Sequence, residues 1–304
     1  MRILLAICLL TCAAARAQAP AKPSAGEPTI TLDVTRVNIL FTVADKKGRF
    51  VKNMSKEDFD VIENKKKQNI LEFAAESELY LRIGVLIDTS NSIRERFRFE
   101  LEAAAEFLNS LIRKDRDKAL VVSFDTQPEL VADLTDDTEL LSKKLRNLRP
   151  GGGTSMYDAM VFACKERLSV DQPMNKFSRA IVIIGDGDDN ASRYTRDQAL
   201  EYMQKAGVVA FAISTNTTKI ESDGDKVLKY FAEQTGGQTF FPFKATDLAQ
   251  DFENIANILR SQYSLLYRPE PLVTDGLFHP IDLKVKGRKD LVVRARKGYY
   301  APRM

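Results

Sequence analysis

The sequence predicts an α/β fold in which a doubly wound, mostly parallel sheet is inserted into a β-sandwich made from N- and C-terminal strands. Two observations support this prediction. Between residues 80 and 260, short apolar runs alternate with amphipathic helical segments, the pattern of a parallel sheet with helices on both faces. The flanking segments, 29–78 and 262–304, contain only strand patterns, and neither has enough strands for a stable sheet of its own. We therefore expect these two segments to pair with each other.

The expected elements follow from apolar periodicity and from glycine and proline positions. The first outer segment alternates apolar and polar residues, and Ser55 caps a single helical turn within it. The last outer segment contributes QYSLLYRPE, HPIDLKVKG and LVVRARKGYY. The inserted domain is expected to span residues 79–261. Its expected strands are 81–87, 118–124, 128–132, 178–185, 208–213 and 238–243, and its expected helices are 93–113, 136–147, 154–168, 195–206, 223–235 and 245–260.

The N-terminus has the layout of a secretory signal peptide. A basic start is followed by an apolar run too short to span a bilayer, and then by the small-x-small site Ala15-Arg16-Ala17. We expect a signal peptide over 1–17, a flexible linker over 18–28, and a periplasmic or secreted mature chain without a transmembrane span. Cys12 faintly resembles a lipobox cysteine, so lipid anchoring there is the alternative. Cys8 and Cys12 lie in the expected signal peptide, so its removal would leave Cys164 as the one remaining cysteine and no intrachain disulfide.

Composition and charge are those of an ordinary globular protein. The 304 residues are 44% hydrophobic and 29% charged, and the formal net charge is +3. Basic and acidic residues are interleaved along the chain, which is typical of a solvated surface. A net charge this close to neutral does not suggest nucleic-acid binding, so we expect no nucleic-acid partner.

Polar side chains are concentrated at three places where the expected strands end or a helix begins. Asp88, Ser90 and Ser92 follow the first apolar strand of the inserted domain, and Asp186 follows the third. Thr154 stands after three glycines and before a helix. Ligands of open parallel sheets bind beyond the carboxyl ends of the strands, where the strand order reverses. We therefore expect these five residues to meet at that edge.

This D-x-S-x-S…T…D order resembles the metal-ion-dependent adhesion site (MIDAS) of von Willebrand factor type A domains, which have a Rossmann-like fold. The resemblance covers about residues 80–260. The flanking stretches KGRFVKNMSKEDFDVIENKKKQNI and LVVRARKGYYAP resemble the acidobacterial VWFA-related domain family. The resemblance implies that Ser90, Ser92 and often Thr154 touch the metal directly, while Asp88 and Asp186 act through water.

The chemistry of the residues points the same way. Two carboxylates neutralise a divalent ion, and hydroxyl oxygens are weak, hard donors that suit Mg²⁺, Ca²⁺ or Mn²⁺ better than Zn²⁺ or copper. We expect Mg²⁺ first. Such an ion keeps an open position, and a carboxylate from a protein partner is the natural ligand to fill it.

Each of these residues also has a simpler interpretation. Ser92 and Thr154 could cap helices, and Asp186 could be a turn residue, as Asp188, Asp189 and Asn190 are expected to be. Their occurrence together at three strand ends, in the right order, favours the metal site. Asp158 is expected to lie behind the site or on the surface.

Catalysis finds less support. Asp88-Thr89-Ser90 resembles the loop of aspartic proteases, but that chemistry needs two carboxylates that share a proton, and no second such loop occurs in the sequence. The single histidine, His279, is expected at a turn or an edge, and there is no G-x-S-x-G motif.

We therefore expect an exported, non-enzymatic binding or adhesion protein that captures an acidic protein ligand through a divalent metal. A metal-independent interaction scaffold and an aspartic-type hydrolase are the alternatives. The sequence leaves the oligomeric state open.

Overall fold

The computed structural model describes residues 36–75, 79–90, 97–171 and 176–303. The expected signal peptide, the linker, Cys12 and Ser92 lie outside these ranges.

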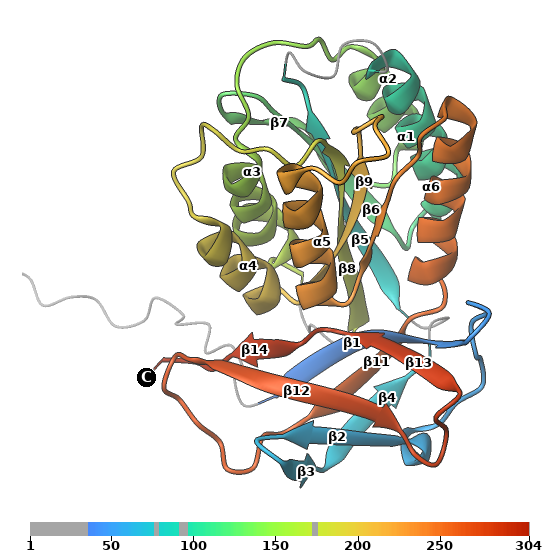
Figure 1. Cartoon of the computed structure of the whole chain (residues 1–304), viewed down its shortest axis with the longest axis vertical. Helices are drawn as coiled ribbons and strands as arrows, with labels where there is room; N and C mark the ends of the chain where they lie inside the picture. Colours follow the sequence, from blue (N-terminus) through green and yellow to red (C-terminus); the bar gives the residue numbers. More distant parts are fainter. Residues whose placement is uncertain (1–35, 76–78, 91–96, 172–175, 304) are drawn as a thin grey trace, which may run out of the picture. The chain divides into compact units, whose positions relative to one another are not determined.

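A six-stranded sheet forms the centre of the α/β part, in the order β10-β9-β8-β5-β6-β7 (Figure 1). All neighbouring strands are parallel except β7, which runs antiparallel to β6 at one edge. The predicted mostly parallel sheet is therefore confirmed. Its strands are β5 (Tyr80–Asp88), β6 (Lys118–Phe124), β7 (Pro128–Thr135), β8 (Phe177–Gly185), β9 (Val208–Ser214) and β10 (Gln238–Phe240).

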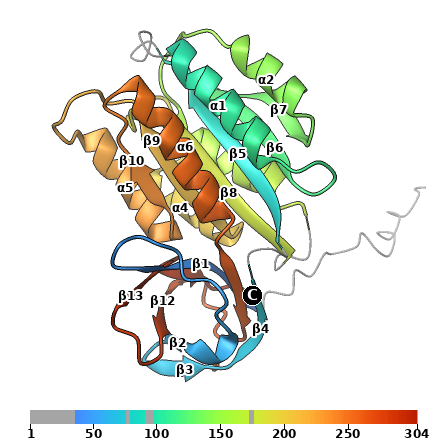
Figure 2. The same cartoon turned by 90° about the vertical axis from the view of Figure 1, so that its right-hand side faces the viewer.

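Helices cover both faces of this sheet, as the two views in Figures 1 and 2 show. One face carries α1 (Phe97–Leu111), α2 (Thr138–Arg146) and α6 (Ala245–Leu259). The opposite face carries α3 (Met156–Ala163), α4 (Arg196–Lys205) and α5 (Asp223–Thr235). A π-helical segment, Cys164–Leu168, continues α3, so the helix expected over 154–168 changes its winding part-way.

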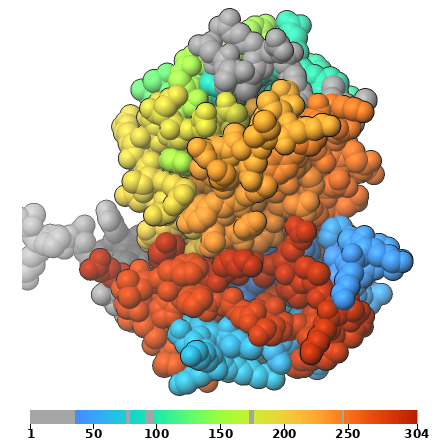
Figure 3. All heavy atoms as spheres, viewed as in Figure 1, coloured from blue at the N-terminus to red at the C-terminus, as the bar shows by residue number. Residues whose placement is uncertain are grey.

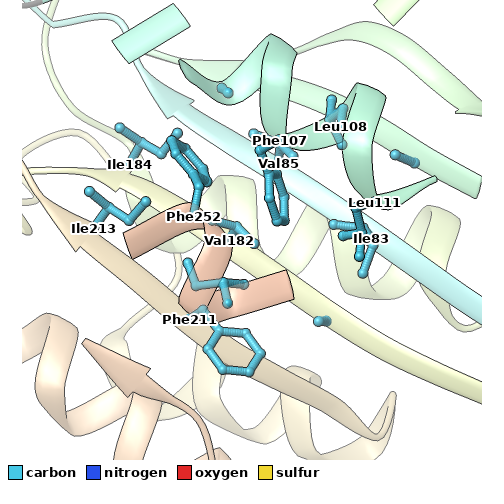
Figure 4. Close-up of a cluster of buried hydrophobic side chains, with 14 of the residues drawn as sticks. Ile83, Val85, Phe107, Leu108, Leu111, Val182, Ile184, Phe211, Ile213 and Phe252 are labelled. Carbon is cyan, nitrogen blue, oxygen red and sulfur yellow. The ribbon is translucent and has the colours of Figure 1, made fainter. Parts of the chain in front are cut away.

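Successive residues of the central strands point to opposite faces and so supply two separate cores. On β5, Val85 joins the core beneath α1 and α6, while Leu86 joins the core beneath α3, α4 and α5. Figure 4 shows the first of these cores, where Phe107 of α1 lies with its ring centre 4.9 Å from that of Phe252 of α6. Burial on both faces explains why these strands are continuous apolar runs in the sequence.

The outer segments form two four-stranded antiparallel sheets, β13-β1-β11-β4 and β14-β12-β2-β3. The predicted pairing of N- and C-terminal strands is confirmed, because β1 lies between β11 and β13 and β12 pairs with β2. The strands are β1 (Val37–Asp45), β2 (Phe59–Glu63), β3 (Lys66–Gln68), β4 (Ile70–Ala74), β11 (Tyr263–Tyr267), β12 (Phe278–Val285), β13 (Leu291–Ala295) and β14 (Gly298–Tyr300), with the predicted short turn at Lys56–Asp58.

The two antiparallel sheets share one hydrophobic core, which makes them a sandwich. Phe41 of β1 and Phe59 of β2 come from different sheets, and their ring centres lie 4.9 Å apart. The chain leaves the sandwich after β4 and returns on β11, and these strands pair with Ala74 opposite Ser264. The inserted part therefore begins and ends on neighbouring strands. The domain boundaries at 78/79 and 261/262 stay predictions.

The expectation that His279 lies at a turn or an edge is wrong. His279 lies on β12 between two other strands and is only 7% exposed. Its Nδ1 is 3.3 Å from Oε1 of Glu63, and its Nε2 is 3.2 Å from Oδ1 of Asp275. Nε2 can therefore hydrogen-bond to Asp275, whereas Nδ1 lies near Glu63 but has no hydrogen-bond partner among the described residues. No helix in the described part of the chain is long and apolar enough to cross a membrane.

Candidate metal centre

The strand order of the parallel sheet reverses between β5 and β8. From β5 the chain builds β6 and β7 on one side, and it later builds β8, β9 and β10 on the other. Asp88 ends β5, and Asp186 directly follows β8. The structure therefore places the two predicted carboxylates at the crevice where ligands of doubly wound sheets bind.

Asp88 is fully buried, and its two oxygens have different surroundings. Its Oδ1 accepts a hydrogen bond of 2.7 Å from the backbone N–H of Ser90. Its Oδ2 is buried and has no hydrogen-bond partner among the described residues. Burial raises the pKa of Asp88 to about 6; hydrogen bonds from Ser90 and from the backbone of Asp186 oppose this rise, and the nearby charge of Asp186 adds to it. A buried carboxylate oxygen without a donor is costly unless a cation satisfies it.

Gly185 gives Asp88 the space it occupies. A Cβ at Gly185 would lie 2.9 Å from Cβ of Asp88 and 3.2 Å from its Oδ2. Neighbouring strands β5 and β8 therefore approach closely enough to seat the carboxylate only because residue 185 has no side chain.

The loop that carries Asp186 is fixed against the start of α5. Gly187 has φ +84°, and a Cβ there would lie 2.2 Å from the carbonyl oxygen of Gly224. Within the loop, the N–H of Asp188 donates to Oδ1 of Asp186 at 3.1 Å. The position of the Asp186 carboxylate thus depends on two glycines whose backbones are in contact.

Thr154 is buried in the third segment, and its backbone is bonded to the Asp186 loop. Its N–H donates to Oδ1 of Asn190 at 3.0 Å, and its carbonyl accepts the N–H groups of Asn190 and Ala191, each at 3.0 Å. On the other side, the N–H of Gly151 donates to the carbonyl of Thr89 at 2.6 Å. Together with the Asp88–Asp186 proximity, these bonds join all three predicted segments pairwise.

The start of α3 is capped from the Asp186 loop. Ser155, at the N-cap position, makes no capping bond with its side chain. Instead Asp189 accepts the N–H of Tyr157 at 2.9 Å, and Ser192 accepts the N–H of Asp158 at 3.0 Å. In return, Asp158 accepts the N–H groups of Arg193 and Tyr194. The interpretation of Thr154 as a helix cap thus finds no support.

The supporting roles of these loop residues were not predicted from the sequence. Asp189 and Asn190 were expected to be turn residues only, but they hold α3 and Thr154 in place. Their pattern, a run of short polar residues after a buried strand, also occurs in ordinary turns. A supporting loop differs from an ordinary turn only in that it bonds to another loop more than 30 residues away, and this bonding is visible only in the folded structure. Ser92, the fifth predicted residue, lies outside the described part of the chain.

Replacing Gly185 with alanine is expected to weaken metal binding about tenfold, the effect typical of a change that displaces a ligand from behind. The new methyl group would push on Cβ and Oδ2 of Asp88. Gly151→Ala is the matched control in the same cluster of loops, because a Cβ there meets nothing within 4 Å. Calorimetric titration of both variants with Mg²⁺ tests this. Equal losses in the two variants would contradict the proposed seat for Asp88.

Comparison with known proteins assigns part of the α/β region to a known domain type. The model of the von Willebrand factor type A domain matches residues 83–188, a range that includes Asp88 and Asp186. The chain contains a von Willebrand factor type A (VWA) domain. The match begins within β5, includes Thr154 and ends just after β8. The finer resemblance to the acidobacterial family stays a prediction.

Solved structures with the VWA fold agree with this assignment. A von Willebrand factor type A protein from Catenulispora acidiphila is 14% identical, with a TM-score of 0.52, over 81% of this chain and 74% of that one. Proximal thread matrix protein 1 from the mussel byssus, with a zinc-occupied MIDAS motif, is 15% identical with a TM-score of 0.50. That match covers 65% of this chain and 49% of the mussel protein.

A third solved structure has a lower TM-score. The PilB minor pilin from Streptococcus sanguinis is 13% identical with a TM-score of 0.48, over 60% of this chain. This chain covers 62% of the pilin's length. A search of curated protein sequences gives no match. At these identities the comparisons establish the fold of the VWA domain.

Proposed function

We propose that this chain is an exported adhesion protein that captures a protein partner through a divalent metal ion. Asp88, Ser90, Ser92, Thr154 and Asp186 would hold the ion, and a carboxylate of the partner would complete its coordination. The observation that carries the proposal is the buried Oδ2 of Asp88, which has no hydrogen-bond partner among the described residues and lies close to the charge of Asp186 at the sheet's reversal point. Export rests on the sequence of residues 1–17 alone.

The donor set fits a hard divalent cation. Two carboxylates balance the charge of the ion, and the hydroxyl groups of the serines and Thr154 add neutral oxygens. A bound ion would supply the positive charge that the Asp88 carboxylate lacks, and it would act as a Lewis acid toward an incoming carboxylate. The backbone bonds among the three loops would keep the ligand oxygens in place before the ion arrives.

Mg²⁺ is the ion we propose first, with Ca²⁺ and Mn²⁺ as alternatives. The zinc-occupied motif of the mussel protein adds Zn²⁺ to the ions that need testing. Zinc also binds carboxylate oxygens, although it prefers nitrogen and sulfur. The Cys and His content of the chain makes a conventional zinc site a poor alternative, since Cys164 is buried and His279 lies in the sandwich core.

The first test measures metal and partner binding together. We expect calorimetry on the EDTA-stripped full chain to give one divalent ion per molecule. We also expect a pulldown from the cell envelope to retain a partner with Mg²⁺ and to release it with EDTA. Asp186→Ala should lose both the ion and the partner.

Two alternative functions make different predictions in the same experiment. A metal-independent scaffold would retain its partner in EDTA and in the Asp186→Ala variant. An aspartic-type hydrolase would cleave casein, and Asp88→Asn would block the cleavage. Either result would replace the proposed function.

A further inference from the structure

Two hollows lie side by side next to the candidate metal centre, and Arg149 lines both. The larger has a volume of about 750 Å³ and lies between the N-terminal half of α1 and the C-terminal end of α2. The smaller has a volume of about 440 Å³ and includes Thr89, Asp125 and Lys144 in its lining. Arg149 belongs to the segment that connects α2 to the Thr154 loop.

The smaller hollow adjoins the metal loop itself. Thr89, which lines it, lies between the proposed ligands Asp88 and Ser90, and its carbonyl accepts the N–H of Gly151. A peptide segment whose carboxylate reached the metal would therefore lie beside this hollow, and Arg149 connects this hollow to the larger one.

Among the described lining residues of the larger hollow, basic side chains outnumber acidic ones. Arg98, Arg146 and Arg149 line it with Glu102, which is paired with Arg146, with Nη2 2.9 Å from Oε2. Arg98 and Arg149 have no carboxylate partner in the ranges that the structure describes. Nη1 of Arg149 donates to the carbonyls of Arg146 and Leu148, at 3.2 and 2.8 Å. These bonds orient the guanidinium and leave its remaining N–H groups available.

The floor of the larger hollow is apolar. Phe97 and Leu101 are buried within it, and Leu148 and Pro150 complete the lining. The lining of the smaller hollow is mixed in charge, since it includes Asp125 and Glu129 as well as Lys144 and Arg149. An apolar floor beneath two unpaired guanidinium groups suits a peptide with acidic and apolar side chains better than a fully hydrated polyanion.

We propose that the partner's bound segment is an extended acidic peptide with two carboxylates. The first binds the metal, and the second, further along the segment, binds Arg149 and Arg98, while an adjacent apolar side chain covers Phe97 and Leu101. Arginine binds carboxylates through paired N–H groups, which gives such a contact geometric specificity. This inference rests on the proposed function and names the class of partner for the same site.

Synthetic peptides test the inference with the full chain and Mg²⁺. The reference peptide is glycine-rich and contains one Asp and one Leu. The other peptides add a Glu at increasing distances from the Asp. By NMR titration at low salt, we expect the added Glu to tighten binding about two- to fivefold at one spacing, the range typical of an exposed ion pair. Arg149→Gln should remove that gain.

Arg193→Gln is the matched control. Arg193 is exposed, lies in the loop that carries Asp186, and loses the same charge on substitution. It should keep the gain from the added Glu. A gain that is equal in both variants, or no gain at any spacing while the single-Asp peptide still binds with Mg²⁺, would overturn the inference and leave the proposed function intact.

Two further results separate the remaining possibilities. If a heparin fragment binds through Arg149 without Mg²⁺ and the peptides gain nothing from Glu, the hollow is a polyanion site and the inference is wrong. If no peptide binds in a Mg²⁺-dependent way, the proposed function fails and the inference fails with it.

Discussion

Replacing Asp88 with asparagine is expected to abolish divalent-metal binding and, at the same time, to stabilise the metal-free protein. Metal affinity should fall at least about 100-fold, because the variant loses one of two charges that hold the ion. The metal-free stability should rise by about 1–2 kcal/mol at neutral pH. Opposite signs in the two measurements distinguish a binding residue from a structural one.

The stability change follows from the surroundings of Asp88. Burial raises its pKa to about 6 in the folded chain, above the value of the unfolded chain. The folded protein therefore favours the neutral form, and the ionised carboxylate destabilises it above that pKa. Asparagine is neutral at every pH and similar in shape, and its Oδ1 can still accept the N–H of Ser90.

Calorimetric titration and urea unfolding in EDTA provide the two measurements. Asp188→Asn is the matched control, because it removes the same charge two residues from Asp186 and its side chain is exposed. The control should lose no more than about fivefold in affinity, since it changes only an exposed neighbouring charge. An Asp88→Asn variant that binds Mg²⁺ normally would contradict the proposed site, and one that unfolds more easily in EDTA would contradict the role of burial.

The second large effect concerns the opposite end of the sheet. Replacing Asp117 with asparagine is expected to lower the free energy of unfolding by about 3 kcal/mol, the cost of breaking a buried ion pair. Asp117 is fully buried just before β6. Its Oδ2 accepts hydrogen bonds from Nε of Arg113 at 2.8 Å and Nη2 of Arg260 at 2.7 Å, and its Oδ1 accepts the N–H of Leu81 at 2.9 Å.

Asparagine cannot replace this carboxylate. Its amide nitrogen would face the guanidinium groups of Arg113 and Arg260, which are also donors, so two cations would lose their acceptor. Arg260 caps the end of α6, directly before the chain returns to the sandwich on β11. The contact therefore ties α1, β5 and β6 to the end of α6.

The same contact predicts an acid-dependent loss of stability. Burial opposes ionisation of Asp117, but the hydrogen bonds from Arg113, Arg260 and Leu81 outweigh it and lower the pKa to about 2. Because the folded pKa lies below the unfolded value, the contribution is complete above about pH 4 and is lost as the pH falls toward 2. Between about pH 4 and 2, the free energy of unfolding of wild type should fall by about 2 kcal/mol because of Asp117. The Asp117→Asn variant should lack this contribution.

Asp290→Asn is the control for this prediction. The pKa of Asp290 is also lowered to about 2, by its hydrogen bonds with Arg288, but this pair is exposed to solvent. Solvent screening weakens such pairs, so urea unfolding of this variant should resemble that of wild type. If Asp117→Asn lowered the free energy of unfolding as little as Asp290→Asn does, burial would not strengthen the ion pairs of Asp117 as we expect.

Much of the architecture could be predicted because burial leaves periodic traces in the chain. The continuous apolar runs of β5, β6 and β8 indicated strands covered on both faces, and the structure confirms them. The strand-only segments at each end predicted the split sandwich for a similar reason, since too few strands on either side could not bury a core alone. Helix ends were less well predicted, because capping contacts extend between loops: α3 is capped by Asp189 and Ser192.

The sequence by itself determined the α/β class, the inserted order of the elements and the positions of Asp88, Ser90, Thr154 and Asp186 at strand and helix ends. Only the tertiary structure decided which loops meet, that Asn190 supports Thr154, that Glu63 and Asp275 enclose His279, and that Arg149 lies between two hollows. The physical reason is the range of the interactions. Periodicity and caps are local and can be read along the chain, whereas burial of a charge and its pairing depend on residues that only folding brings together.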